Sequence, residues 1–273
     1  MPLASWLADC QRRWDLSHAM VELVRRAGYQ VVPTDPGNPQ DLRKDHTGAI
    51  ITRLLSWGSP LPPLKVFSWG PVYRPYRGTW EDAIDVEVLQ AGVQAGEEDI
   101  RRLLRRLLER FPLPEPSRLV VGHIGLLHAL LAAVGLEEDR RARVLDLLRQ
   151  GDTLAAGRLL GPESWVEDLW RPLPLETVRA AVARTGLEAD PRWEELAGWT
   201  TGPWSESRID LSLVGSFPYY TGTVFHLYAP GWGQEGVAGG RYTWGEGVRG
   251  VGFVVKPEVW TTLPYPAEKE SRA

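Results

Sequence analysis

The sequence contains one cysteine, no long apolar run and only a small excess of charge. Because Cys10 is the single cysteine among 273 residues, no disulfide can form within the chain, and no histidines and cysteines have the spacing of a zinc site. No apolar stretch reaches the roughly 18–20 residues of a membrane span, and the first residues lack a hydrophobic signal core. We therefore expect a cytoplasmic protein without membrane segment, metal or cofactor.

The charge balance disfavours a nucleic-acid-binding body. Lys and Arg number 31 against 35 Asp and Glu, so the formal net charge is −4, whereas binding to a phosphate backbone relies on positive charge. One local basic face is present, because five arginines follow helical spacing within residues 97–111. We interpret that face as a solvated helix surface, and most of the 13 tryptophans as anchors of the core and of interfaces.

The hydrophobic pattern predicts an α+β domain in which helices are inserted between strands. Helices are predicted over residues 6–27, 47–55, 97–111 and 124–134, and strands over residues 29–33, 65–73, 86–94, 118–122 and within 208–255. Residues 74–85 are predicted to be the polar connection of a hairpin, and three acids to open the helix at 97–111.

The middle of the chain has a different pattern from its two ends. Residues 137–199 show only helical patterns, broken at glycine and proline, so we predict a helical insert there. The core would then be formed by residues 1–136 and 200–273. Strands first, helices next and strands again favour an antiparallel sheet with segregated helices.

Residues 231–236 read GWGQEG and match the glycine pattern of a dinucleotide-binding loop. Such a loop must open a helix whose N-terminus holds the pyrophosphate. Residues 237–242 are instead glycine-rich and extended in character, so the pattern indicates a tight connection between two strands.

Two early segments carry polar side chains suited to a small ligand. Residues 42–47 read LRKDHT, in which the carboxylate of Asp45 and the hydroxyl of Thr47 can accept hydrogen bonds from an ammonium group. Residues 69–74 read WGPVYR, and VLQAGVQ follows at 88–94. These segments supply a carboxylate, a hydroxyl, an arginine and two amides.

A third group of segments lies near the C-terminal end of the sequence. Residues 219–231 read YYTGTVFHLYAPG, followed by GGRY at 239–242 and GVGF at 250–253. The pattern predicts a strand rich in aromatic and β-branched residues, a glycine turn and a second strand. Phenol hydroxyls and one guanidinium would converge there on a small polar ligand.

In this order the segments resemble the histidyl-tRNA synthetase family. They resemble most closely its synthetase-like members that act as regulatory subunits of ATP phosphoribosyltransferase, the first enzyme of histidine biosynthesis. The resemblance extends over residues 42–255. It implies a class II aminoacyl-tRNA synthetase-like fold, an antiparallel sheet flanked by helices, with the helical insert where the synthetases have theirs.

The resemblance also implies a pocket for histidine. The residues that match the ammonium end of the ligand are Asp45, Thr47 and Gln90. The residues that match the surroundings of the imidazole are Tyr220, Tyr242 and Gln94, the last replacing the family's usual glutamate. The complete set of implied ligand-binding residues is Asp45, Thr47, Arg74, Gln90, Gln94, Tyr219, Tyr220, Arg241 and Tyr242.

Departures from the family pattern fall on groups that adenylate chemistry needs. Adenylate formation places negative charge on a transferring phosphoryl group, which fixed cations must stabilise. Gly215 stands where the synthetases carry the arginine of L-V-R-G-L-D-Y-Y, and Val259 stands where they carry that of G-L-E-R. Residues 74–77 read RPYR instead of R-H-E-R, and the chain ends at Ala273, without room for an anticodon-binding domain. We therefore expect no catalytic residues.

The resemblance implies a non-catalytic regulatory subunit, required for activity of a short-form ATP phosphoribosyltransferase catalytic subunit and for allosteric feedback inhibition by histidine. Such subunits form dimers that join the transferase in a hetero-octamer. We therefore expect a self-dimer, the short transferase as partner and L-histidine as effector, and no membrane or nucleic acid as partner. Three alternatives stay open: a histidyl-tRNA synthetase-like adenylate-forming enzyme or fragment, a free-standing histidine-binding module, and a pocket filled by core packing.

Overall fold

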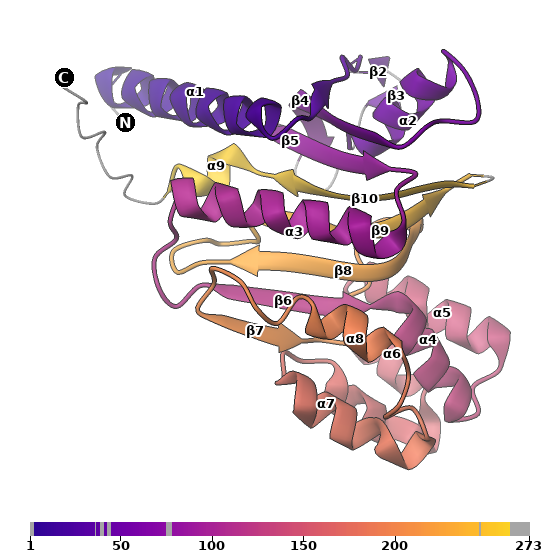
Figure 1. Ribbon diagram of the computed structural model, residues 1–273. Helices are drawn as coiled ribbons and strands as arrows, with labels where there is room; N and C mark the ends of the chain where they lie inside the picture. Colours follow the sequence, from indigo (N-terminus) through magenta and orange to yellow (C-terminus); the bar gives the residue numbers. More distant parts are fainter. Residues whose placement is uncertain are drawn as a thin grey trace.

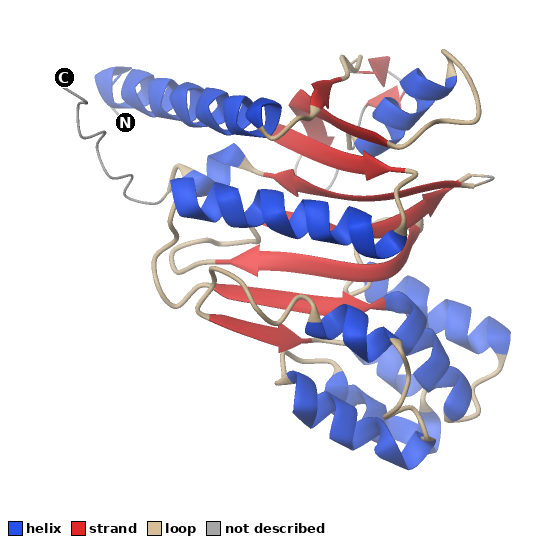
Figure 2. Cartoon of the chain, viewed as in Figure 1, coloured by secondary structure: helices blue, strands red, loops and turns tan. Residues whose placement is uncertain are grey.

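A mixed eight-stranded sheet forms the centre of the computed structural model (Figures 1 and 2). The structure describes residues 3–35, 37–38, 41–42, 45–74, 78–245 and 247–262, without the side chains of residues 37, 38, 41, 42, 74 and 162. The strand order is β1-β4-β5-β10-β9-β8-β6-β7. Neighbouring strands are antiparallel except for the pairs β1–β4 and β6–β7, which are parallel.

The strands of this sheet come from both ends of the chain. They are β1 (Gln30–Val31), β4 (Leu64–Arg74), β5 (Thr79–Leu89), β6 (Arg118–His123), β7 (Glu206–Ile209), β8 (Tyr220–Tyr228), β9 (Val237–Trp244) and β10 (Val248–Val255). Two short strands, β2 (Gly37–Asn38) and β3 (Asp41–Leu42), pair with each other outside it. The predicted antiparallel sheet flanked by helices is confirmed, with a parallel strand added at each edge.

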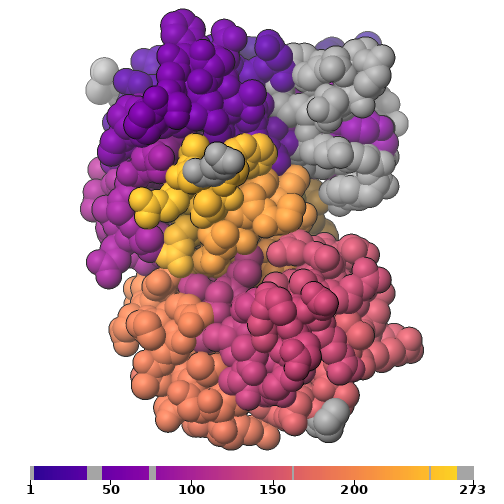
Figure 3. All heavy atoms as spheres, turned by 90° about the vertical axis from the view of Figure 1, so that its right-hand side faces the viewer, coloured from indigo at the N-terminus to yellow at the C-terminus, as the bar shows by residue number. Residues whose placement is uncertain are grey.

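The helices lie on the sheet and at one of its edges. They are α1 (Leu3–Arg26), α2 (Thr47–Leu55), α3 (Val93–Arg110), α4 (Ile124–Ala133), α5 (Glu138–Arg149), α6 (Thr153–Arg158), η1 (Gly161–Leu169), α7 (Leu175–Val182), η2 (Ala183–Thr185), α8 (Arg192–Ala197) and α9 (Pro257–Trp260). Helix α3 lies across one face of the sheet in Figure 1. Helices α4 to α8 gather beside β6 and β7, and they form the lower, pink to orange part of Figure 3.

Apolar side chains fill both faces of the sheet. The larger cluster includes Val86 and Val88 of β5 together with Ile100 and Leu104 of α3. The smaller cluster lies on the other face, between α2 and the sheet, and consists of Val32, Ile50, Ile51, Leu61, Val66, Leu89 and Tyr242. Because successive residues of a strand point to opposite faces, β5 and β9 serve both clusters.

The predicted hairpin was wrong in its boundaries. Strand β5 already begins at Thr79 and ends at Leu89, so residues 79–85 belong to the strand and not to the polar connection. Its acidic residues do not face solvent, since Glu81, Asp85 and Glu87 are all buried. The neighbouring elements cover this polar face, which sequence periodicity alone cannot reveal.

The predicted start of the helix at 97–111 was also wrong. Helix α3 begins at Val93, so residues 93–94 are helical and not strand, and no acid lies in the first turn. The chain turns at Gln90, which has a left-handed φ of 56°, and Gly92 is the N-cap. A left-handed residue directly after a strand ends the extended pairing, and this conformation is uncommon for glutamine.

A substitution at Gly122 of β6 would test how closely the sheet packs against the loop that leads to β8. A Cβ at this position would collide with the backbone oxygens of Leu213 and Asp210. We expect Gly122→Ala to lower the free energy of unfolding by about 1–3 kcal/mol, as overpacking does. Gly58→Ala is the matched control, because no atom lies within 4 Å of its added Cβ. Equal midpoints in urea denaturation for the two variants would contradict this packing.

Candidate functional site

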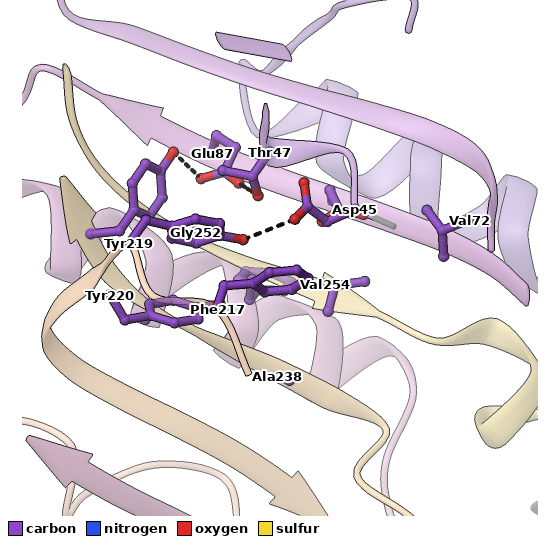
Figure 4. A pocket seen from close by; sticks show the side chains of 14 residues that line it. Asp45, Thr47, Val72, Glu87, Phe217, Tyr219, Tyr220, Ala238, Gly252 and Val254 are labelled. Atoms are coloured by element: carbon purple, nitrogen blue, oxygen red, sulfur yellow. Dashed lines mark hydrogen bonds between the residues drawn. The ribbon is translucent and has the colours of Figure 1, made fainter. Parts of the chain in front are cut away.

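A small cavity lies on the face of the sheet opposite α3 (Figure 4). Its volume is about 40 Å³, little more than the roughly 30 Å³ of one water molecule in the liquid. Its polar lining consists of Asp45, Thr47, Asp85, Glu87, Tyr219, Tyr220 and Tyr242. In Figure 4 the acidic side chains and Thr47 lie on one side, and the aromatic side chains of residues 217–220 lie across from them.

Five of the nine sequence-predicted ligand-binding residues line this cavity. They are Asp45, Thr47, Tyr219, Tyr220 and Tyr242. The first two come from the start of α2, the next two from the entry of β8, and the last from β9. Segments nearly 200 residues apart in the chain are therefore brought together, as the resemblance implied.

The other four predicted residues lie elsewhere. Gln90 follows β5, and its Oε1 accepts a hydrogen bond from the backbone N–H of Arg249 at 3.2 Å. Gln94 is exposed on the first turn of α3. Arg241 precedes Tyr242 in β9 and therefore points to the opposite face. The side chain of Arg74 lies outside the described residues. A ligand-binding role for all nine residues stays a prediction.

Glu87 is the buried polar residue that sequence reasoning missed. It lies in β5, is only 2% exposed, and lines the cavity. Its carboxyl accepts hydrogen bonds from Thr47 Oγ1 at 2.6 Å and from the Tyr242 hydroxyl at 2.8 Å. The sequence feature that contains Glu87 is the alternation of acids and valines in residues 85–88. Such alternation is typical of a strand with one face in solvent, so it predicts an exposed glutamate. Here α2 and the aromatic residues cover that face.

Two glycines of β10 make room for these head groups. Gly252 pairs with Glu87, and a Cβ on it would collide with the Glu87 carboxylate. A Cβ on Gly250 would collide with the Tyr242 hydroxyl. The glycines of the GVGF segment are therefore required for the close approach of backbone and polar side chains.

Asp45 connects α2 to the aromatic side of the cavity. Its Oδ1 accepts from the backbone N–H of Gly48 at 3.0 Å, and its Oδ2 accepts from the Tyr219 hydroxyl at 3.2 Å. Tyr219 also stacks on Phe217, with the ring centroids 5.1 Å apart. The loop before β8 thus covers the cavity and is held to α2 by a charged hydrogen bond.

Burial shifts the pKa values of the groups that line the cavity, and its phenols keep their protons. Burial, partly offset by the hydrogen bonds from Thr47 and Tyr242, raises the pKa of Glu87 to about 7, and the charge of Asp45 adds to the rise. Burial also raises the pKa of Tyr220 and Tyr242 above the usual range of phenols. None of the lining residues in the described part of the chain is basic. The described part of the lining is therefore acidic and phenolic.

Gly215 is the residue that the resemblance matches to a catalytic arginine of the family pattern. Its φ is 72°, in the left-handed region, and a Cβ built on it would lie 2.6 Å from the Tyr220 ring. A larger side chain would require both backbone strain and displacement of that ring. The second replacement, Val259, is buried within α9.

A second polar cluster lies on the opposite face of β9. The guanidinium of Arg241 contacts Glu195 Oε2 of α8 at 2.5 Å and Glu97 Oε1 of α3 at 3.4 Å, and Glu195 also pairs with His123 at 3.0 Å. Burial alone would raise the pKa of Glu195, but the hydrogen bond with His123 and the charge of Arg241 lower it to about 2. This cluster connects the strand of Tyr242 to two helices.

A family model described as histidyl-tRNA synthetase matches residues 42–259, which is most of the chain. The chain belongs to the histidyl-tRNA synthetase family. Among curated proteins it is similar to the ATP phosphoribosyltransferase regulatory subunit of Chromobacterium violaceum, with 34% identity over 165 residues. That match covers 56% of this chain and 42% of the relative. The chain spans less than half the length of the first curated relatives it matches.

Solved structures show the same fold at low identity. A Bacillus halodurans protein described as an ATP phosphoribosyltransferase regulatory subunit/histidyl-tRNA synthetase has a TM-score of 0.74 and 23% identity, covering 96% of this chain and 80% of that one. A chain of the ATP phosphoribosyl transferase (HisG:HisZ) complex of Thermotoga maritima has a TM-score of 0.66 and 19% identity, covering 90% and 97%. The expected class II synthetase-like fold is confirmed.

Neither a metal site nor a membrane helix was found in the part of the chain that the structure describes. Those residues contain no group of three or more His, Cys, Asp or Glu placed to hold a metal ion. Within the same residues no helix has the length and apolar character needed to cross a bilayer.

Because Glu87 is buried with a raised pKa, we expect the free energy of unfolding to depend on pH. Its pKa rises from 4.5 to about 7 on folding, so between these values the unfolded state ionises while the native state keeps its proton. Stability should fall as pH rises through this window, by at most about 3 kcal/mol from this residue.

Urea denaturation at pH 5 and pH 8 measures this effect. We expect Glu87→Gln to lose less stability than the wild type between the two pH values, because the amide does not ionise. The exposed Glu109→Gln serves as control and should follow the wild type. A Glu87→Gln variant with the same pH dependence as the control would contradict the assigned shift.

Proposed function

We propose that this chain is a non-catalytic regulatory subunit of ATP phosphoribosyltransferase, acting in the first step of histidine biosynthesis. It would be required for activity of the short catalytic subunit and would carry its feedback inhibition by histidine. Membership of the histidyl-tRNA synthetase family and similarity to proteins named as such regulatory subunits support this role.

The conformation at Gly215 carries the non-catalytic part of the proposal. A synthetase needs an arginine at this position of the family pattern to stabilise charge on the reacting groups. In this chain the position is a left-handed glycine whose Cβ direction is blocked by Tyr220. In place of a cationic side chain, this position therefore has a glycine against which the Tyr220 ring packs closely.

The polar lining of the cavity supports histidine as the effector. Asp45 and Thr47 provide acceptors for an ammonium group, and the phenols of Tyr219, Tyr220 and Tyr242 can hydrogen-bond an imidazole. A cavity of about 40 Å³ is too small for the whole molecule. Histidine would therefore bind a conformation in which residues 217–219 have moved away.

This requirement offers a physical basis for feedback. A ligand shifts an equilibrium only by its difference in affinity for the two states. If the loop before β8 is open in the inhibited state of the assembly and closed in the active state, histidine binds the former better. The coupling free energy between effector and transferase then equals the difference between the free energies of histidine binding to the two states.

Exposed apolar residues on α1 support assembly with other subunits. Leu3, Trp6, Leu7 and Trp14 expose between 50% and 70% of their surface, and large exposed apolar side chains gathered on one helix are typical of interaction sites. We assign this helix to the self-dimer within the proposed hetero-octamer with the short transferase.

Purification with the short transferase tests the proposed role. The chain should co-purify with it and raise its phosphoribosyltransferase activity, while showing no exchange between ATP and pyrophosphate in the presence of histidine. Measurable exchange would favour an adenylate-forming enzyme instead. Histidine binding without any association would favour a free-standing binding module.

Two conservative variants test the pocket. We expect Asp45→Asn and Tyr242→Phe each to weaken histidine inhibition by about ten-fold or more, because each removes a charged or buried hydrogen bond worth about 1.5–3 kcal/mol. Assembly should be unchanged in both. Tyr228→Phe is the matched control, since its hydroxyl contacts His226 at 3.2 Å in the same sheet but does not line the cavity. Undiminished histidine inhibition in both pocket variants would contradict the assignment of this cavity as the histidine-binding site.

A further inference from the structure

The pairing between β8 and β9 is interrupted opposite Arg241. Tyr220 of β8 pairs with Tyr242 of β9. The next regular pair is Val224 with Gly240, so three residues of β8 face Arg241 alone. Extra residues of this kind form a β-bulge, which disrupts the ladder of hydrogen bonds locally. Arg241 is therefore held on its β8 side by something other than regular strand pairing.

Contacts of the Arg241 side chain take the place of that pairing. The guanidinium lies over Gly222 of the bulge, where a Cβ would collide with it. It contacts Glu195 of α8 at 2.5 Å and Glu97 of α3 at 3.4 Å. Two carboxylates on separate helices thus hold β9 at the interruption, and the glycine of the bulge leaves the room that this requires.

Glu195 meets Arg241 as an ionised and oriented carboxylate. Burial would raise the pKa of this group, but His123 and Arg241 lower it to about 2, so it is charged at neutral pH. Its Oε2 accepts a hydrogen bond from Nε2 of His123 at 3.0 Å. The Nδ1 of His123 accepts from the backbone N–H of Leu126 at 3.2 Å, which places the ring proton on Nε2. The histidine therefore helps to orient the carboxylate.

Glu195 lies near the end of the predicted helical insert, residues 137–199. Trp199 of the same segment is fully buried, and its Nε1 donates to Glu97 Oε2 at 3.2 Å. Its ring stacks on Phe225 of β8, with the centroids 4.3 Å apart. These contacts attach the last segment of the insert to the face of the sheet that α3 covers, where Figure 1 also shows α8.

The placement of Tyr242 depends on its neighbour Arg241. Tyr242 is the next residue of β9 and points into the cavity on the other face. The two residues before Arg241 are Gly239 and Gly240, which have no side chains that could anchor the strand. The contacts of Arg241 therefore fix the position and twist of β9 where Tyr242 enters the cavity.

We propose that Glu195 is a positioning residue for the cavity: through Arg241 it fixes the part of β9 that carries Tyr242, so docking of the insert and ligand binding are coupled. The coupling rests on the proposed function, because it takes the cavity as the histidine site, whereas the placement of β9 does not. Coupling is reciprocal. Release of the insert therefore weakens histidine binding, and bound histidine stabilises the docked insert.

Fluorine NMR of the whole chain containing 3-fluorotyrosine tests the placement of β9 without any ligand. The Tyr242 resonance, assigned with Tyr242→Phe, should shift or broaden in Glu195→Gln, which loses the ion pair. It should also change in Glu195→Asp, which keeps the charge but withdraws the carboxylate by one methylene group. Glu194→Gln is the matched control, because Glu194 is exposed on the same helix and should leave the resonance unchanged.

Titration with L-histidine, on the chain and on its complex with the short transferase, tests the coupling. We expect Glu195→Gln to weaken histidine binding about 3- to 10-fold, a typical size for an effect transmitted through packed residues. Glu194→Gln should bind histidine as the wild type does. A residue that served only the stability of the insert would change the unfolding midpoint, but neither the affinity of the folded chain nor the Tyr242 resonance.

The outcomes separate this inference from the proposed function. An unchanged Tyr242 resonance in both Glu195 variants would overturn the inference, and Glu195→Asp keeps the test decisive if Glu195→Gln does not fold. Equal changes at Tyr29, a buried tyrosine before β1, would also overturn it, because they indicate a general loosening. Unchanged histidine affinity in Glu195→Gln would overturn the coupling. If the wild type binds no histidine, alone or in the complex, the proposed function fails, and the Tyr242 resonance still decides whether Glu195 positions β9.

Discussion

The pair of hydrogen bonds that Thr47 and Tyr242 donate to Glu87 holds the pocket side of the sheet together. Each partner comes from a different element, α2, β9 and β5, so one buried carboxyl joins a helix and two strands that are not neighbours in the sheet. Strand β10 passes between the two strands, and its glycines allow the contact. Buried polar groups of this kind are stable only when their partners are in place, so the geometry of the cavity depends on all of these elements together.

Strand β9 makes polar contacts on both faces of the sheet. Tyr242 points into the cavity, and Arg241 points to Glu195 of α8 and Glu97 of α3. A displacement of β9 therefore affects both the pocket and the helices beyond the sheet, since packed interiors transmit strain. The loop before β8 is held by the Tyr219–Asp45 hydrogen bond, by a backbone hydrogen bond from Thr243 to Tyr219, and by ring contacts of Tyr219 with its aromatic neighbours.

The family fold is present, and a resemblance of fold does not by itself carry the family's chemistry. A fold supports many functions, and function follows from the groups at the site. In this chain, acidic and phenolic groups line the cavity, and the resemblance matches Gly215 and Val259 to two arginines of the family pattern. Recognition of a ligand needs well-placed acceptors, but phosphoryl transfer also needs positive charge at the reacting group. The two capacities therefore depend on different groups, which is the physical basis of the proposed regulatory role.

Much of this molecule was determined locally by its sequence. The α+β class, the helix at 47–55, the strands that carry the YY and GGRY segments, and the family all followed from short-range periodicity and from motif order. These features depend on residues close in the chain, where propensity and alternation act directly.

The rest was decided only by tertiary structure. Glu87 follows a pattern that is typical of a solvent-facing strand residue, and it becomes a buried pocket group only because α2 and residues 217–220 cover its face. Arg241 and Tyr242 are adjacent in sequence, yet the pleat sends them to opposite faces. The left-handed conformation at Gln90 ended the strand and placed Gln94 on a helix. Sequence periodicity reports which face a side chain takes, but only the packing of distant segments determines what covers that face.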